Sequence, residues 1–146
     1  MGPMDRPQLL ERLATGRVAR LATVDAAGNP HLVPLVFAVD GNRVYSAVDH
    51  KPKRTHLLQR LRNIAANPAV ALLADHYEDD WSRLWWVRVD GTAEVIETGP
   101  TWERAIEVLA DKYPQYRGHP PDGSAIIITI DRISGWAADE ATAAGS

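Results

Sequence analysis

The sequence contains no cysteine, which excludes a disulfide framework, a thiolate metal site and a cysteine nucleophile. It also lacks any apolar run approaching the roughly 20 residues that a membrane-spanning helix needs. The polar, charged segment from Met1 to Arg12 does not have the pattern of a secretory signal. We therefore expect a soluble, cytoplasmic protein whose fold depends on its hydrophobic core.

Several common functional motifs are missing as well. The chain has no glycine-rich dinucleotide motif, P-loop, zinc-protease helix or serine nucleophile elbow. Its five histidines are scattered without ligand spacing, so no metal site is expected (His31, His50, His56, His76 and His119). Without an evident catalytic side chain, either a bound cofactor carries the chemistry or the protein is not an enzyme.

Length and composition are those of one ordinary globular domain. The 146 residues include 45% apolar and 24% charged residues, and we expect a single domain over residues 1–136 with a flexible tail over 137–146. The net charge of -3 argues against a nucleic-acid partner, because binding to phosphate backbones needs a dominant basic surface.

One short segment departs from this acidic balance. Between His50 and Arg62 there are five cations and no acidic residue (Lys51, Lys53, Arg54, Arg60 and Arg62). The first of them lie where a predicted strand meets a predicted helix, and the others are expected along the exposed side of that helix. Cations at a helix N-terminus oppose the helix dipole unless an anion compensates, and the free N–H groups there favour a phosphate. The alternative interpretation is a run of solvated surface charges.

The pattern of apolar residues and turns predicts the order of elements. A helix begins at Asp5, whose spacing to Gln8 matches a capping box, and three strands in meander order follow over residues 17–24, 31–39 and 43–48. A helix after Pro52 leads to strands over 69–75 and 84–96, with a bulge near Asp90 and Gly91. A helix over 100–113 and a buried strand over 125–136 complete the chain. This order predicts a mainly β, α+β fold in which an antiparallel sheet closes on itself with helices at its ends.

Two further features concern binding. Pro34 interrupts a good strand, which places that strand at a sheet edge or beside an opening where a flat ring could lie. Protection of an edge strand is the alternative explanation for this proline. Trp85 and Trp86 are adjacent in a strand and must face opposite sides, so one is expected inside the barrel and the other toward a ligand or partner.

The segments 20–25 and 28–37, RLATVD and GNPHLVPLVF, resemble the opening hairpin of the pyridoxamine 5'-phosphate oxidase-like superfamily of split β-barrel flavin-binding proteins. Residues 51–58 and 67–73 are similar to its phosphate-binding turn, helix and next strand, and the motifs at 80–82 and 90–93 match its later strands. The likeness runs from about Arg12 to Trp136. Within the superfamily the chain is most similar to an actinobacterial branch that uses the deazaflavin coenzyme F420.

This resemblance implies a homodimeric split barrel with cofactor bound between the subunits and hydride passing to or from the deazaflavin ring. By position, the phosphate would be held by Lys51, Lys53, Arg54 and Thr55. The ring would lie along Val33, Pro34, Leu35 and Val36, with backbone contacts from Ser46, Ala47 and Val48, and Trp85 and Arg88 would reach it from the partner subunit. Several family members have a single lysine in this turn, whereas here Lys51, Lys53 and Arg54 compete for that position. The additional positive charge suits the longer anionic tail of F420 better than it suits FMN. The expected function is that of an F420-dependent oxidoreductase acting on a small organic substrate. FMN is the alternative cofactor, in an oxidase or flavin reductase, and a non-catalytic flavin, deazaflavin or haem carrier is a further alternative.

Overall fold

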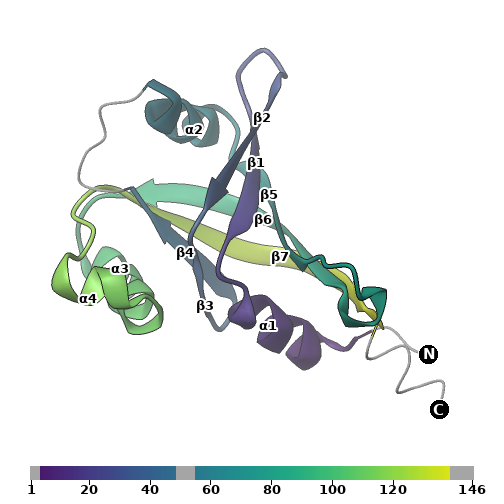
Figure 1. Cartoon of the computed structure of the whole chain (residues 1–146). Coiled ribbons are helices and arrows are strands. Elements are labelled where there is room, and N and C mark those ends of the chain that lie inside the picture. Colours follow the sequence, from purple (N-terminus) through teal and green to yellow (C-terminus); the bar gives the residue numbers. More distant parts are fainter. Residues whose placement is uncertain (1–3, 49–54, 139–146) are drawn as a thin grey trace.

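Seven strands form one antiparallel sheet in the order β2-β1-β5-β6-β7-β4-β3. The computed structural model describes residues 4–48 and 55–138, apart from the side chains of residues 55–58. Its strands are β1 (Ala19–Val24), β2 (Pro30–Leu35), β3 (Ala38–Asp40), β4 (Arg43–Ala47), β5 (Ala69–His76), β6 (Trp85–Ile96) and β7 (Ala125–Ala137). The sheet curls into a half-barrel (Figure 1), which confirms the predicted α+β split barrel.

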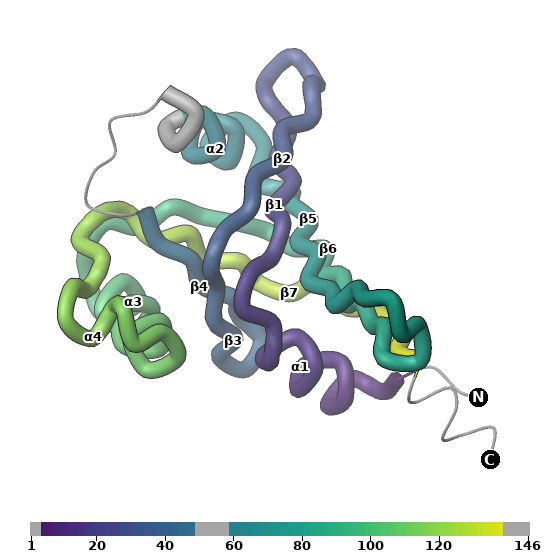
Figure 2. The backbone as a smooth tube through the Cα atoms, in the orientation of Figure 1, coloured from purple at the N-terminus to yellow at the C-terminus, as the bar shows by residue number. Residues whose placement is uncertain are grey.

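The helices lie around this curled sheet. They are α1 (Arg6–Thr15), α2 (Thr55–Ala66), α3 (Pro100–Lys112) and α4 (Pro114–Gly118), with the 3-10 turn η1 (Trp81–Arg83) before β6. The predicted capping box begins α1: the Asp5 carboxylate accepts from the Gln8 N–H, and the Gln8 side chain accepts from the Asp5 N–H. Figures 1 and 2 show α1 and α2 at opposite ends of the half-barrel, and α3 and α4 beside β3 and β4.

Two apolar clusters hold the sheet, one on each face of β7. The larger cluster fills the inside of the half-barrel and includes Ile126, Ile128 and Ile130 of β7. The smaller cluster lies between the sheet and α3 and includes Ala125 and Ile127. Successive strand residues point to opposite faces, so burial on both faces explains why residues 126–130 of this strand are all β-branched. The prediction of a buried central strand is confirmed.

The prediction of one strand over residues 31–39 is wrong. The chain leaves β2 at Leu35 and begins β3 at Ala38, and these two strands lie at opposite edges of the sheet. The Tyr113 hydroxyl accepts from the Phe37 N–H (3.1 Å) and lies 2.9 Å from the carbonyl oxygens of Phe37 and Arg17, to one of which it donates. A uniformly apolar run gives no sign of this break, because the buried hydroxyl that satisfies the crossover comes from a distant helix end.

Lys112 also contacts the crossover between β2 and β3. Its ammonium donates to the Gly16 carbonyl (2.6 Å) and lies 4.0 Å from the centre of the Phe37 ring. Burial, helped by the nearby Arg17 cation, lowers the pKa of Lys112 to about 8 from its ordinary value of 10.5. The charged side chain is therefore partly desolvated in the folded protein.

We expect the stability of the protein to rise as the pH is raised from 7.5 to 9.5, by about 1 kcal/mol after allowance for solvent screening. In this window the unfolded chain keeps the Lys112 proton that the folded protein releases. Urea denaturation of wild type and Lys112→Met at both pH values measures the effect, and the gain should be absent from the variant. The comparison stays below pH 10, because burial raises the pKa of Tyr45 and Tyr113. At higher pH the unfolded chain loses these tyrosine protons before the folded protein does, which lowers the free energy of unfolding. Equal pH slopes in the two proteins would contradict the assignment.

The predicted bulge in β6 is confirmed between Asp90 and Gly91, where the register with β7 shifts. A Cβ atom on Gly91 would meet the Thr129 carbonyl oxygen at 2.5 Å and the Ile128 Cγ2 atom at 2.6 Å. The two backbones approach so closely here that no side chain fits between them.

Gly91→Ala is expected to lower the free energy of unfolding by roughly 2–3 kcal/mol, because backbone atoms must move to admit the methyl group. Gly118→Ala is the matched control, since nothing lies within 4 Å of the position that a Cβ atom would take there and its backbone is not left-handed. Chemical denaturation of both variants gives the comparison, and equal stability of the two would show that the bulge can relax.

Within the residues described, no helix is both long enough and apolar enough to cross a bilayer. Strand β7 extends to Ala137, and Ala138 is buried and donates its N–H to the Leu84 carbonyl. The remaining part of the expected tail, residues 139–146, lies outside the described residues.

Candidate functional site

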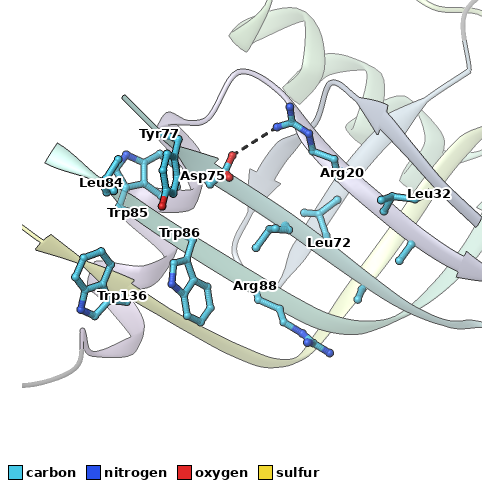
Figure 3. A pocket seen from close by; sticks show the side chains of 13 residues that line it. Arg20, Leu32, Leu72, Asp75, Tyr77, Leu84, Trp85, Trp86, Arg88 and Trp136 are labelled. Carbon is cyan, nitrogen blue, oxygen red and sulfur yellow. Dashed lines mark ion pairs between the residues drawn. The ribbon is translucent and has the colours of Figure 1, made fainter. Parts of the chain in front are cut away.

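Part of the outer sheet face carries an open, largely apolar pocket of about 1080 Å³. Its walls come from β1, β2, β5, β6, the end of β7 and the loop that contains Tyr77 (Figure 3). Five of the seven large apolar side chains that are exposed among the described residues line it: Leu32, Leu73, Tyr77, Trp86 and Trp136. Such concentrated apolar exposure marks a binding surface more often than a passive one.

Trp86 and Trp136 form the aromatic part of this pocket. They are direct cross-strand neighbours in the register of β6 and β7, and they are 39% and 37% exposed (Figure 3). Trp85 is partly buried against the inner core, on the same side of β6 as the core residue Val87. Part of Trp85 also lines the pocket wall. The prediction that Trp85 and Trp86 face opposite sides is confirmed, and Arg88 shares the outward face of Trp86.

Charged side chains surround the apolar surface. Arg20 and Asp75 form an ion pair of 3.5 Å across the pocket (Figure 3), and both are partly exposed. Arg88 donates to the Asp90 carboxylate at 2.7 Å, which raises the pKa of Arg88. Exposed pairs of this kind add little to stability, so these side chains remain available to a ligand or a partner.

A second cluster of polar groups lies inside the half-barrel, where α2 packs against β1 and β6. Arg60 of α2 is 8% exposed, and its Nε atom has no hydrogen-bond partner. We find no carboxylate paired with this guanidinium among the residues that the structure describes, and burial alone lowers the pKa of Arg60. An unpaired buried cation is costly, and buried charges are normally paired.

The groups around Arg60 are polar as well. Asn63 lies one turn further along α2, is 1% exposed, and donates to the Thr23 hydroxyl at 3.0 Å, while its own oxygen accepts from Gln59 at 2.6 Å. Thr23 is paired in register with His31 of β2. The Nδ1 atom of His31 is also buried without a hydrogen-bond partner. This end of the barrel therefore carries two unsatisfied polar atoms in an otherwise apolar interior.

The residues predicted to hold a cofactor fall in several places. Lys51, Lys53 and Arg54 lie outside the described residues, and Thr55 is the first residue of α2. Pro34 is exposed on β2, and this strand lies at the edge of the sheet, as the proline predicted. Val33 instead points inward against the core. The other predicted residues near this strand are Leu35 and Val36. Leu35 belongs to the larger cluster inside the half-barrel, and Val36 packs against the smaller cluster beside α3.

The predicted backbone contacts at the end of β4 are partly used within the protein. The Ser46 hydroxyl donates to the Val36 carbonyl at 2.8 Å, and the Val48 N–H donates to the Ser124 carbonyl at 2.7 Å. Ala47 pairs with Ala125 of β7 and is partly buried. β3 pairs with β4 only as far as Ala38 and Tyr45, so on the side away from β7 Ser46 and Ala47 border the crossover and not a strand.

Sequence reasoning placed Arg60 on the exposed side of its helix, and this placement is wrong. The exposed cation is Arg62, which donates to Gln59 at 2.7 Å, whereas Arg60 is buried. A signal was present: Arg60 lies four residues before Ile64 and therefore on the same side of α2 as that core residue. Arg60 therefore belonged to the predicted basic segment but not to the predicted cofactor site.

Residues 6–137 match the family model of pyridoxamine 5'-phosphate oxidase. Because this match covers most of the chain, the protein belongs to that family. The seven-stranded split barrel described above is the fold on which the two candidate sites are built.

Individual relatives are more distant. The chain is 35% identical over 81 residues, 55% of its length, to a 5a,11a-dehydrotetracycline/5a,11a-dehydrooxytetracycline reductase from Streptomyces rimosus; the match spans 56% of that reductase. An FAD-binding protein from Mesorhizobium loti has a similar fold, with a TM-score of 0.69 at 22% identity, covering 92% of this chain and 95% of that protein. The haem storage protein HutZ from Vibrio cholerae also has a TM-score of 0.69, at 18% identity, covering 90% and 93%.

Proposed function

We propose that this protein is a flavin-type oxidoreductase that uses coenzyme F420 and transfers hydride between the deazaflavin and a small organic substrate. The observation that supports it most is the buried guanidinium of Arg60 beneath α2, whose Nε atom has no hydrogen-bond partner and which faces no carboxylate among the described residues, in a family of flavin-linked oxidases. A phosphate in this position would supply the missing counter-charge. The cofactor provides the redox chemistry, and the protein residues bind and orient it.

The choice of F420 over FMN depends on charge. Arg60 and Arg62 follow the cations Lys51, Lys53 and Arg54, which gives more positive charge than one phosphate monoester needs. The relative from Streptomyces rimosus is a reductase, which is consistent with hydride delivery to an organic acceptor. The predicted phosphate contacts of Lys51, Lys53, Arg54 and Thr55 remain part of this proposal, with Arg60 added to them.

We further propose that two copies of the chain pair through the outer-face pocket. The pocket surface combines an apolar centre, formed by Trp86 and Trp136, with separated charges of both signs, including Arg20, Asp75 and Arg88. A surface of this composition is suited to contact with a second copy of itself. In such a dimer Arg88, together with Trp85 or Trp86, would approach a ring bound along the backbone of Val33 to Val36 of the other subunit.

Fluorescence and absorbance titrations of the purified protein with F420, FMN and haem test the proposal. We expect F420 to bind with micromolar affinity or better and FMN to bind more weakly. Tight FMN binding without an F420 response would favour an FMN-dependent oxidase or flavin reductase. Cofactor binding without oxidation of reduced F420 by any of a panel of organic acceptors would favour a carrier, and a haem spectrum with an axial-ligand signature would exclude the deazaflavin assignment.

A further inference from the structure

His31 carries the second buried nitrogen that lacks a partner. It lies on the inward side of β2, between Pro30 and Leu32, which are both exposed. Its Nδ1 atom contacts no donor or acceptor among the described residues. Buried polar atoms in folded proteins nearly always have a hydrogen-bond partner, and each exception calls for an explanation. Among the side chains that the structure describes, the exceptions are Nδ1 of His31 and Nε of Arg60.

These two atoms belong to one cluster rather than to unrelated parts of the barrel. His31 is directly opposite Thr23 in the β1–β2 register, and the Thr23 hydroxyl accepts from Asn63 at 3.0 Å. Arg60 lies one helical turn before Asn63, on the same buried side of α2. The strand register, this hydrogen bond and the helical spacing therefore place the imidazole of the edge strand and the guanidinium of the helix in the same part of the barrel interior.

Neither the Arg60 Nε atom nor the His31 Nδ1 atom has an acceptor within hydrogen-bond distance. The Thr23 hydroxyl and the Asn63 oxygen are already engaged with Asn63 and Gln59 respectively. The Arg60 guanidinium can only donate, and the imidazole Nδ1 atom donates when it carries the proton. An anionic oxygen entering beneath α2 would satisfy both side chains at once, whereas an ordinary core histidine would be expected to have a partner in the folded protein.

We propose that His31 is a binding residue for the anionic chain of the cofactor, donating from Nδ1 to a phosphate oxygen that Arg60 contacts at the same time. This proposal rests on the proposed function, because the phosphate is that of the deazaflavin or flavin. It assigns to β2 a role separate from its predicted contact with the ring. His31 and Arg60 then hold the phosphate from two elements, β2 and α2, whose spacing is fixed by the contact between Thr23 and Asn63.

Three substitutions at this position separate a hydrogen-bond role from a packing role. His31→Asn places an amide nitrogen close to the position of Nδ1, His31→Gln places one close to Nε2, and His31→Ala removes both. In titrations with F420 and FMN we expect His31→Asn to bind within about threefold of wild type. We expect His31→Gln and His31→Ala to bind roughly tenfold more weakly or worse, which corresponds to loss of one hydrogen bond to a charged group.

Thermal melts without ligand establish that each variant is folded, and melts with added inorganic phosphate provide a readout independent of the cofactor. Phosphate should raise the melting temperature of wild type and His31→Asn more than that of His31→Gln or His31→Ala. If wild type binds neither F420 nor FMN but shows this phosphate pattern, the proposed function fails and the role of His31 stands. Equal binding by the Asn and Gln variants, or no phosphate effect on wild type, would overturn the role of His31.

Discussion

Arg60→Met is expected to change stability and cofactor affinity in opposite directions. The free protein should gain about 1–2 kcal/mol in unfolding free energy, because methionine removes a desolvated cation while it fills a similar volume. Affinity for F420 should fall roughly 10- to 100-fold, since hydrogen bonds to a charged group are worth about 1.5–3 kcal/mol. Urea denaturation and fluorescence titration measure the two quantities on the same preparation.

Arg62→Met is the matched control for this experiment. Arg62 is on the same helix and carries the same charge, but it is exposed and bonds to Gln59. We expect this variant to stay within about 0.5 kcal/mol of wild-type stability, as is usual for surface substitutions, and its loss of affinity should be much smaller. A fall in the stability of Arg60→Met would show that the guanidinium is already compensated in the free protein, and the inference of an anion site would then lose its basis.

Trp136→Glu is expected to convert the protein from a dimer to a monomer. The substitution places a charge in the apolar centre of the proposed subunit contact, where it would be desolvated without a partner. Aromatic residues at the centre of an interface commonly contribute about 2 kcal/mol or more, so we expect the dissociation constant to rise at least about 30-fold. Size-exclusion chromatography with light scattering over a range of concentrations gives the mass directly.

Trp81→Glu provides the control for the added charge. Trp81 is 71% exposed in η1 and does not line the pocket, so the variant should remain a dimer. Cofactor affinity should fall with Trp136→Glu and not with Trp81→Glu if the second subunit completes the site. The subunit proposal is wrong if wild type is monomeric at every concentration, or if Trp136→Glu has the mass of a dimer.

Much of the fold could be predicted from local signals. The capping box at Asp5, the bulge at Gly91 and the buried β-branched strand that became β7 each depend on a few neighbouring residues, and all three are confirmed. The break at Val36 and Phe37 could not be predicted. Its cause is Tyr113, 76 residues from Phe37 in the sequence, whose hydroxyl replaces the strand partner of the crossover.

The candidate site was predicted less completely for a similar reason. The basic composition of residues 50–62 indicated an anion, but composition does not show which cation the fold buries. That depends on the angle at which α2 rests on β1, which brings Asn63 to Thr23 and turns Arg60 inward. Likewise, alternation along β6 predicted that Trp85 and Trp86 diverge, but only the register with Trp136 identifies Trp86 as part of an aromatic pair.

The position of β7 has a consequence for biosynthesis. This strand is formed by the last described segment of the chain, yet it lies in the sheet between β6 and β4. As the ribosome releases the chain from its N-terminus, the hairpin of β3 and β4 has no neighbour to join until residues 125–137 have emerged. The half-barrel can therefore be completed only after these residues have emerged, and the nascent chain must keep the inner faces of β4 and β6 from other partners until then.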